Sequence, residues 1–329
     1  TMLKQFHHRV RAWPTPVAGL ALGIASLGAC LENALPFPGA AQNTGALIAA
    51  VLLTVLAVRF VLHPDTLVQD IRHPVAGSIV PTFAMGVMVV SKALGRFLPG
   101  AGEALWLFAV VVPLVSLAFF LYYRAKAWQL HEMVPSWFVP PVGIVVADVT
   151  CPGAAWTEPA LILLAIGMIS YLVMLPVMIY RFLFHREIPD GAKPTIAIMA
   201  APASLSLAGY LTVVKSPSLP ICLALLGLAL AMTLVTYLAF FRLMRLPFSP
   251  GYAAFTFPMA IGAIALYKTA DMTARFPDLS SYTRLLGTLA LAELIVATLV
   301  IGYVCLRFLH YYLFPRRIRT QRSNAGPVQ

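Results

Sequence analysis

The sequence predicts an all-α polytopic membrane protein with ten transmembrane helices. Hydrophobic residues make up 60% of the 329 residues and charged residues only 11%, whereas about 25% of the residues in a soluble domain are charged. The apolar residues form ten runs, and a helix that crosses a hydrocarbon core needs about 20 such residues. Ten spans use most of the chain, so no room remains for a separate soluble domain.

The ten predicted spans follow one another with short polar connections. They cover residues 15–35, 44–62, 75–98, 103–123, 136–152, 159–184, 194–214, 219–243, 251–270 and 283–306. We divide the chain into an N-terminal segment (1–13), a ten-helix transmembrane domain (14–307) and a basic C-terminal tail (308–329). The alternating ten-residue pattern of a transmembrane β-barrel is absent from the sequence.

Lysine and arginine are distributed unevenly between the alternate connections. Of the 23 basic residues, 17 fall on the side that carries both termini and 6 on the other side. Basic residues near spans favour the cytoplasmic side, so we expect cytoplasmic termini in a plasma (inner) membrane. Topology also explains the net charge of +11 without nucleic acid as a partner. The tail from Arg316 to Arg322 is expected to bind lipid headgroups.

Prolines reveal an internal repeat. Each odd-numbered span opens with a proline, where the missing N–H costs nothing, and the intervals are 56 to 61 residues: Pro14, Pro74, Pro135, Pro194 and Pro250. Four of these spans contain a further proline, which removes a helical hydrogen bond and kinks the helix: Pro81, Pro140 with Pro141, Pro202 and Pro258. The repeat predicts five helical hairpins, in which a kinked helix is followed by a straighter one.

The repeat favours five inner helices around a central pore, with their five partners in an outer ring facing lipid. Broken backbone at membrane depth is tolerated where it is buried or lines a water-filled cavity. Small residues such as Gly19 and Gly23 would keep a narrow lumen open, although they also permit close helix packing. We favour the lumen because the internal prolines recur in four of the five odd-numbered spans.

Six segments spread over most of the chain point to a known family. They are PTPVAGLALGIASL (14–27), LEN (31–33), RHPV (72–75), PSWFVPP (135–141), KPTIAIMAAPA (193–203) and AFTFPMA (254–260). Together they resemble the tellurite-resistance/dicarboxylate transporter family, which includes bacterial TehA and the plant guard-cell slow anion channels. The resemblance runs from about residue 14 to 306. It implies a homotrimer in which each protomer has its own anion pore.

The resemblance also implies that Phe257, in AFTFPMA on the ninth span, blocks the pore. A phenyl ring across a narrow lumen is a hydrophobic constriction that can close it. Pro258 follows directly and disfavours helical geometry at residue 257, so the ring can turn toward the axis. Phe255 is grouped with the pore-lining residues, although it points elsewhere on the helix. Without the repeat and the resemblance, Phe257 would be one phenylalanine among 19, and its ring would simply pack against its neighbours.

Three acidic residues need a separate interpretation. Glu293, in the middle of the tenth span, is either a proton-coupling group or a structural carboxylate at a helix or trimer contact. We favour the structural role because that span belongs to the presumed outer ring. Asp148 is expected to be solvated near the outer face, and Glu32 is expected to accept hydrogen bonds at the outer end of the first span.

Basic residues at the outer ends of the odd-numbered spans predict a positive vestibule: Lys92, Arg96, Lys215 and Lys268. No basic residue falls in the middle of those spans, and weak binding suits conduction. We therefore predict an anion channel or facilitative transporter for chloride, nitrate or organic acids. The alternative is a proton-coupled carrier of malate-like dicarboxylates or tellurite-type oxyanions. A polytopic enzyme or scaffold is the second alternative.

No catalytic, metal or cofactor site is expected. The four cysteines form no CxxC pair. The seven histidines all lie at the predicted cytoplasmic interface and lack metal-binding spacing, and no phosphate-binding loop or dinucleotide fingerprint occurs. The expected partners are the lipid bilayer, small anions and further copies of the chain.

Overall fold

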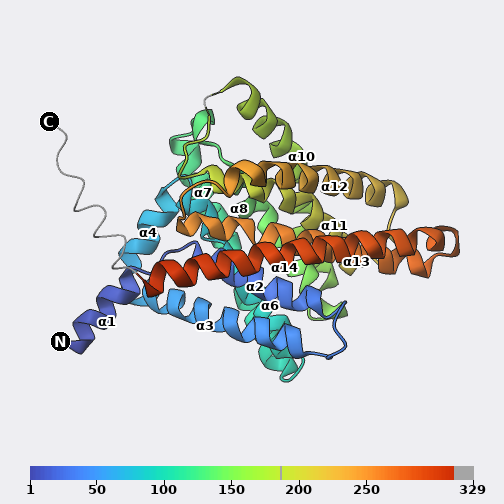
Figure 1. The fold of residues 1–329 in the computed structure, drawn as a ribbon, viewed down its shortest axis with the longest axis horizontal. Coiled ribbons are helices and arrows are strands. Elements are labelled where there is room, and N and C mark those ends of the chain that lie inside the picture. Colours follow the sequence, from blue (N-terminus) through green and yellow to red (C-terminus); the bar gives the residue numbers. More distant parts are fainter. Residues whose placement is uncertain (186, 315–329) are drawn as a thin grey trace.

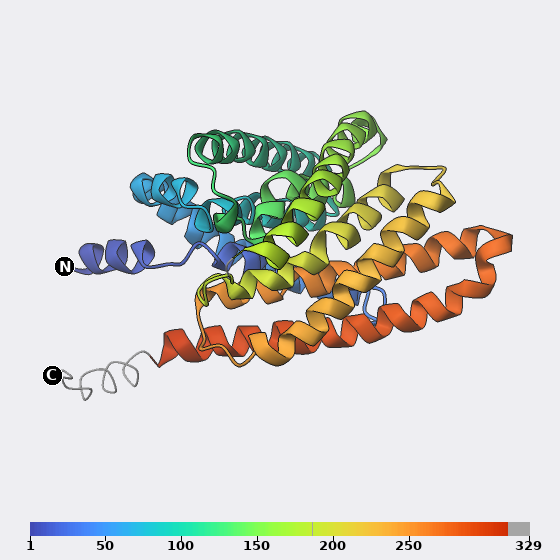
Figure 2. The ribbon, with the colours of Figure 1, turned by 90° about the horizontal axis from the view of Figure 1, so that it is seen from above.

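The computed structural model describes residues 1–185 and 187–314, and these residues form helices and connections without any strand. The predicted lipid-binding segment from Arg316 to Arg322 lies outside the described residues. Most helices run roughly along the long axis, and α1 (Met2–Arg11) and the end of α14 (Thr283–Leu313) lie at the same end (Figures 1 and 2). We call this end the basic end and the opposite one the outer end.

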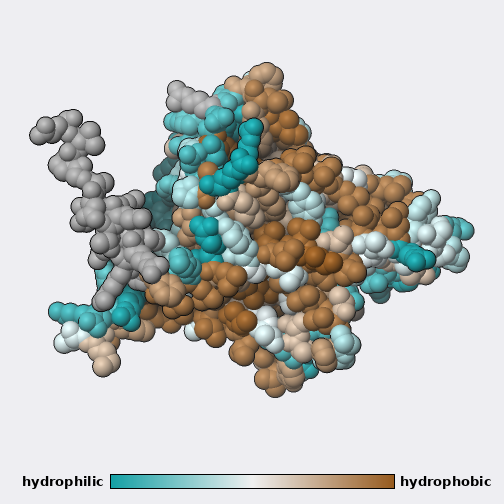
Figure 3. All heavy atoms as spheres, viewed as in Figure 1, coloured by the Kyte–Doolittle hydropathy of each residue, from teal (hydrophilic) through white to brown (hydrophobic). Residues whose placement is uncertain are grey.

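Long helices with much of their surface exposed form the outside of the described part. They are α3 (Ala40–Leu62), α7 (Pro99–Lys126), α10 (Thr157–Phe184), α12 (Leu219–Leu243) and α14. Only 22% to 39% of the most apolar stretch in each of these segments is buried inside the chain. Figure 3 shows hydrophobic residues over most of the middle of one face, with hydrophilic residues gathered toward the two ends. This distribution is typical of a surface that faces lipid.

The segments that correspond to the odd-numbered predicted spans lie in the interior of the bundle, surrounded by these long helices. They are α2 (Val17–Leu31); α5 (Ala76–Ile79) with α6 (Thr82–Gly95); η2 (Pro135–Phe138), α8 (Val139–Val142), η3 (Gly143–Val145) and α9 (Val146–Val149); η5 (Lys193–Ala200) with α11 (Ala201–Val213); and η6 (Pro250–Phe255) with α13 (Phe257–Arg275). In residues 76–95, 193–213 and 250–275, between 72% and 83% of the most apolar stretch is buried. We call these the five inner segments.

The regular helix is interrupted at the predicted internal prolines Pro81, Pro202 and Pro258. Pro202 and Pro258 are each the second residue of an α-helix that follows a 3₁₀ stretch, and Pro81 immediately precedes α6. A proline has no N–H to donate and its ring crowds the preceding turn, so the regular α-helical pattern starts again at that point. By contrast, Pro113 and Pro176 lie within the continuous helices α7 and α10.

The predicted all-α polytopic class is confirmed for the described residues. Eight helical segments there are long and apolar enough to cross a membrane, and two shorter apolar segments, Val17–Leu31 and Pro135–Val149, accompany them. The remaining helices are α4 (Pro64–Arg72) at the basic end and the short turns η1 (Leu130–Glu132), η4 (Ala154–Trp156) and η7 (Pro277–Tyr282). Because two segments are short, the count of ten spans stays a prediction.

Candidate functional site

Two neighbouring cavities lie among the inner segments. The cavity toward the outer end has a volume of about 150 Å³, and the inner cavity, toward the basic end, has a volume of about 50 Å³. Residues from all five inner segments line each of them. Among the described residues, Phe257 and Leu205 are the two that line both cavities. These two side chains therefore occupy the boundary between the cavities.

Phe257 is the first residue of α13 and follows the junction with η6 at Thr256. The Thr256 hydroxyl lies within hydrogen-bonding distance of two carbonyls, 2.7 Å from that of Ala253 and 3.2 Å from that of Gly19 in α2. A Cβ atom at Gly23 would overlap the Thr256 side chain. The absence of a side chain at Gly23 thus lets α2 approach the junction that orients the phenyl ring.

Leu205 reaches the boundary from α11, which packs against α13. It lies in the first turns of α11, three residues after Pro202, and only 2% of its surface is exposed. Phe257 is 7% exposed, so both side chains are buried. Each lies close to a 3₁₀-to-α junction: Leu205 is three residues after Pro202, and Phe257 directly precedes Pro258. The breaks in the inner segments therefore place the two side chains that separate the cavities.

The inner cavity has an apolar lining. Its walls are glycine, alanine, proline and larger apolar side chains, and Thr82 contributes the one side-chain hydroxyl among the described lining residues. Three of the predicted pore-lining residues belong to it: Gly19, Pro202 and Pro258. Because an ion in this space finds few hydrogen-bonding groups, the inner cavity opposes entry of a hydrated ion.

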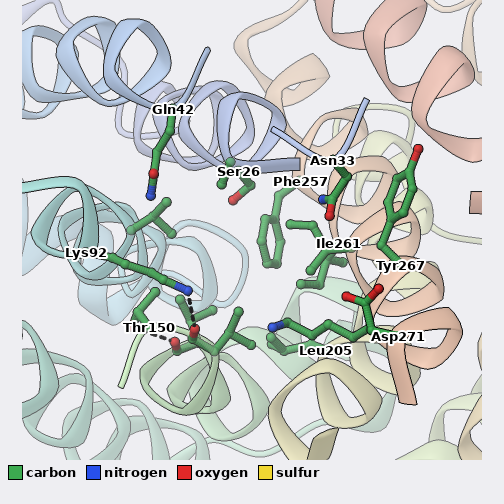
Figure 4. A pocket seen from close by; sticks show the side chains of 16 residues that line it. Ser26, Asn33, Gln42, Lys92, Thr150, Leu205, Phe257, Ile261, Tyr267 and Asp271 are labelled. Carbon is green, nitrogen blue, oxygen red and sulfur yellow. Dashed lines mark hydrogen bonds between the residues drawn. The ribbon is translucent and has the colours of Figure 1, made fainter. Parts of the chain in front are cut away.

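The outer cavity has a polar lining at its mouth. The polar residues there are Ser26, Asn33, Gln42, Lys92, Thr150, Tyr267, Lys268 and Asp271. Figure 4 shows Phe257 near the centre of the view, with Lys92 extending from α6 and Asp271 from α13. The Lys92 ammonium donates a hydrogen bond to the Val149 carbonyl at 3.2 Å. Two lysines and one aspartate give this lining a net positive charge.

Other predicted pore-lining residues lie behind the cavity walls. Outside the two linings are Gly23, Pro81, Pro140, Pro141 and Phe255. Phe255 is fully buried, and its ring centroid lies 4.8 Å from that of Tyr252 and 5.5 Å from that of Phe240. This position agrees with the expectation that Phe255 points away from Phe257. It also makes Phe255 a useful control for mutations at Phe257.

The four basic residues predicted to form a vestibule have different environments. Lys92 and Lys268 line the outer cavity. Arg96 instead donates a hydrogen bond of 2.6 Å to Gln42 and packs beside Gly39, whose φ of 80° suits glycine. Lys215 is exposed in the connection after α11 and lies outside the cavity linings. Two of the four are therefore positioned to act on an ion in the cavity.

Glu32 accepts hydrogen bonds at a helix end, as predicted. Its carboxylate accepts bonds from the backbone N–H of Gln42 at 2.8 Å and of Gly39 at 2.9 Å, at the start of α3. These two bonds satisfy N–H groups that have no partner within the helix. They hold the pKa of Glu32 below its ordinary value. The residue fixes the connection between α2 and α3.

Glu293 lies outside the linings of both cavities. Its carboxylate fills the space beside Gly262 of α13, because a Cβ atom at Gly262 would lie 3.0 Å from Glu293 Oε2. The same point is 3.7 Å from the hydroxyl of Thr233 in α12. Glu293 therefore sits where α14 meets α12 and α13, and its structural role stays a prediction.

The expectation that Asp148 is solvated was wrong. Asp148 has no exposed surface, and neither carboxylate oxygen has a hydrogen-bond partner among the described residues. A Cβ atom at Gly209 in α11 would lie 3.2 Å from the Asp148 Cβ. The inner segment ending at Val149 is short and contacts α6, α10 and α11. Its end therefore lies within the bundle.

The described part of the chain contains no assembled metal site and no disulfide. No group of three or more histidine, cysteine, aspartate or glutamate side chains there is arranged to hold a metal ion. The four cysteines, including Cys30 and Cys151, are free thiols. The outer cavity and its boundary with the inner cavity are therefore the candidate site.

Sequence comparison identifies the family. Residues 17–309 match the family described as SLAC1, voltage-dependent anion channel. The chain belongs to the SLAC1 family. This membership confirms the resemblance drawn from the proline-containing segments, and anion transport is the function known at the level of the SLAC1 family.

Characterised and uncharacterised SLAC1-family relatives have low sequence identity to the chain. Two uncharacterized transporters of Methanocaldococcus jannaschii are 24% and 23% identical over 242 and 240 residues, which cover 64% of this chain in both cases and 69% and 67% of the relatives. The guard cell S-type anion channel SLAC1 of Arabidopsis thaliana is 26% identical over 173 residues, 52% of this chain and 31% of the plant protein.

Proposed function

We propose that the chain is an anion channel or facilitative anion transporter that passes small inorganic anions such as chloride or nitrate. The ions move along the axis of the five inner segments, through the outer and inner cavities. The observation that carries this proposal is the shared boundary: Phe257 and Leu205 line both cavities. Two side chains that separate neighbouring cavities are the arrangement expected of a closed pore.

The pore proposal includes ten spans arranged as five hairpins. The difference in burial between the two sets of helices supports it, because residues 76–95, 193–213 and 250–275 are largely buried and the intervening long helices largely exposed. An inner ring with broken backbone is compatible with a membrane where it borders protein or an aqueous cavity. The two short segments, Val17–Leu31 and Pro135–Val149, complete this ring.

Phe257 and Leu205 act together as the gate in this proposal. Both side chains are apolar and buried, and the inner cavity beyond them offers an apolar lining. An apolar constriction obstructs ions sterically and by excluding water. A modest rotation of either side chain would join the two cavities, since each of the two side chains borders both spaces. Such a gate needs no large movement of the helices.

Selectivity for anions arises at the outer cavity. Lys92 and Lys268 attract negative ions, while Asp271 reduces the net charge and keeps the binding weak. Weak binding allows an ion to leave as readily as it enters. The apolar inner cavity then favours ions that lose their water easily. Chloride and nitrate satisfy this condition better than a dianion.

Orientation and assembly belong to the same proposal. The uneven distribution of lysine and arginine supports cytoplasmic termini in a plasma membrane. We propose a homotrimer in which each protomer keeps its own pore, as the family resemblance implies. The five inner segments of a single chain line both cavities, which is compatible with one pore in each protomer. The bilayer and small anions are the further partners.

A proton-coupled carrier of dicarboxylates or tellurite-type oxyanions is the second candidate function. One observation favours it: Asp148 is a fully buried carboxylate without a hydrogen-bond partner among the described residues, next in sequence to Val149 at the outer cavity. A coupled carrier requires a buried group that gains and loses a proton. Asp148 meets this requirement better than Glu293, which lies away from both cavities.

Electrical recording distinguishes the two functions. The full chain is reconstituted into a planar bilayer with unequal chloride concentrations on the two sides. A channel gives unitary currents whose reversal potential follows the chloride gradient without a proton gradient. Absence of unitary currents, together with oxyanion or dicarboxylate uptake that requires a proton gradient, would replace the channel by the carrier. The Phe257→Ala protein serves as the open reference in the same recordings.

A further inference from the structure

An arginine recurs near the basic end of every long outer helix. The intervals between these residues are 57 to 65 residues, which matches the length of a hairpin: Arg59, Arg124, Arg181, Arg242 and Arg307. Four of the five contact the segment that leads into the inner helix of their own hairpin. Arg242, the fourth in the series, makes no such contact.

The first two members hold their segments by hydrogen bonds. Arg59 is buried, and its guanidinium donates a bond of 2.8 Å to the hydroxyl of Thr15, just before α2. Arg124 is also buried and donates a bond of 2.6 Å to the carbonyl of Arg72, just before the second inner segment. Each arginine thus ties the end of an outer helix to the start of its inner partner.

The third and fifth members make equivalent connections. Arg181 donates to the carbonyls of Met133 at 2.9 Å and His131 at 2.8 Å, before the third inner segment. The guanidinium of Arg307 lies over the rings of Phe248 and Tyr252, 5.4 Å and 5.6 Å from their centroids. Each of these four arginines therefore restrains the residues at the start of an inner segment.

Arg242 differs from the other members of the series. Its side chain is exposed and makes no hydrogen bond or ion pair within the described part of the chain. It faces a cavity of about 330 Å³ at the basic end, between α10, α12 and the start of η5. Among the described lining residues, the charged or ionisable ones are Arg181, His185, Glu187, Lys193 and Arg242. Where the other four arginines contact protein, Arg242 faces open space.

The cavity combines this charge with an apolar wall. The Lys193 ammonium lies 2.7 Å from a carboxylate oxygen of Asp190, a residue that does not line the cavity. Glu187 is the one carboxylate among the described lining residues. The apolar side of the cavity consists of Phe182, Ile188, Ile196, Ala239, Leu243 and Leu246. The adjoining surface of the outer helices exposes large apolar residues, among them Leu238 and Phe241. A molecule that fits this place carries negative charge at one end and hydrocarbon at the other.

We propose that this cavity binds the headgroup of an anionic phospholipid. Arg242 and Lys193 contact the phosphate, and an acyl chain lies along the apolar wall and the exposed surface of α10 and α12. Basic pockets between membrane-spanning helices bind acidic headgroups at the cytoplasmic leaflet in this way. A free phosphate would satisfy the charges but would leave the apolar wall without a partner. In the fourth hairpin, the bound lipid would supply the contact to Arg242 that protein groups supply to the other four arginines.

The test measures lipid binding and does not depend on transport. The delipidated full chain in detergent is titrated with phosphatidylglycerol, with phosphatidylcholine of the same chains, and with inorganic phosphate. Bound lipid is counted by native mass spectrometry, and the thermal unfolding temperature is followed in parallel. We expect phosphatidylglycerol alone to bind and to raise the unfolding temperature. Each of Arg242→Ala and Lys193→Ala should lower its affinity about fivefold, and Arg242→Glu should lower it further.

Arg245→Ala is the matched control, because Arg245 is exposed at the same helix end and lies outside the cavity lining. It should bind phosphatidylglycerol like the unaltered chain. Equal affinity of the Arg242 and Arg245 variants would overturn the proposal, and so would equal stabilisation by inorganic phosphate. A change of oligomer size in Arg242→Ala, accompanied by loss of the lipid effect, would assign the cavity to a contact between copies and would also overturn it.

Discussion

Phe257 of α13 and Leu205 of α11 each line both the outer and the inner cavity, although they lie in different hairpins. In the proposed pore, these two side chains together would form the obstruction. Two kinds of mutation near this boundary should therefore have different effects. Removal of either member should connect the cavities, whereas removal of a neighbouring aromatic residue should only weaken packing.

The first prediction concerns this pair. Phe257→Ala and Leu205→Ala should each raise chloride flux into liposomes several-fold, and the larger increase is expected for Phe257→Ala because more volume is removed. Phe255→Ala is the control, since Phe255 is fully buried against Tyr252 and Phe240. It should lower the free energy of unfolding by about 3 kcal/mol without opening the pore. Unchanged flux in folded Phe257→Ala protein would exclude Phe257 as the gate.

Sequence reasoning reached one member of the pair and missed the other. Phe257 was accessible because a proline follows it within a segment that resembles a known family. Leu205 lies in an apolar helix with other leucines. Neither its residue type nor its spacing sets it apart from them. Only the packing of α11 against α13 brings it to the same boundary. A contact of this kind depends on tertiary structure and leaves no local pattern.

Other parts of the fold show the same division. The prolines predicted the breaks at Pro81, Pro202 and Pro258, because proline acts on its own helix. Asp148 was misplaced, since a polar residue at a helix end normally reaches the surface. That expectation failed because the third inner segment ends inside the bundle. The arginine series is a sequence repeat with the period of the hairpins, but the contacts that its members make follow only from the tertiary structure.

The second prediction concerns the two lysines of the outer cavity. Lys92→Ala and Lys268→Ala should each lower anion conductance at low ionic strength, by up to about tenfold, because a cleft of one charge raises the local concentration of counter-ions. The loss should shrink at about 1 M salt, where the screening length is about 3 Å. Lys215→Ala, outside the cavity linings, should leave conductance unchanged at both salt concentrations. Equal losses in all three variants would dismiss a specific role for the cavity.

The third prediction separates the carboxylates. Glu293→Gln should leave flux and its pH dependence intact, because Glu293 lies beside Gly262 and away from both cavities. Asp148→Asn should also retain flux, with an equal or higher free energy of unfolding, since a buried charge without a partner is costly. Proton-gradient-driven uptake that disappears in Asp148→Asn would instead establish the carrier function.

The fourth prediction is a pH effect on stability at Glu32. Hydrogen bonds from Gln42 and Gly39 hold the pKa of Glu32 below its ordinary value, so its stabilising contribution is fully present above that ordinary value, about 4.3. It is lost as the pH falls through the lowered pKa of the folded state. Glu32→Gln should therefore unfold at a lower temperature than the unaltered chain at pH 7. The difference should disappear at the lowest pH the folded protein tolerates, and a constant difference would refute the role of the charge.

The fifth prediction compares prolines at breaks with prolines in continuous helices. Pro202→Ala and Pro258→Ala should each permit a straighter inner segment with a restored backbone hydrogen bond. Straightening would displace Leu205 or Phe257, because Leu205 lies three residues after Pro202 and Phe257 directly precedes Pro258. Anion flux per inserted protein should therefore change, while insertion and oligomer size stay the same.

Pro113→Ala and Pro176→Ala provide the matched comparison, since both prolines lie within the continuous helices α7 and α10. These helices contribute no described residue to either cavity, so the flux of both variants should stay close to that of the unaltered chain. The four variants are measured in liposomes side by side. Equal effects in the two pairs would mean that the breaks do not position the gate. The division into inner and outer helices would then lose its functional meaning, and the pore would have to be sought elsewhere in the bundle.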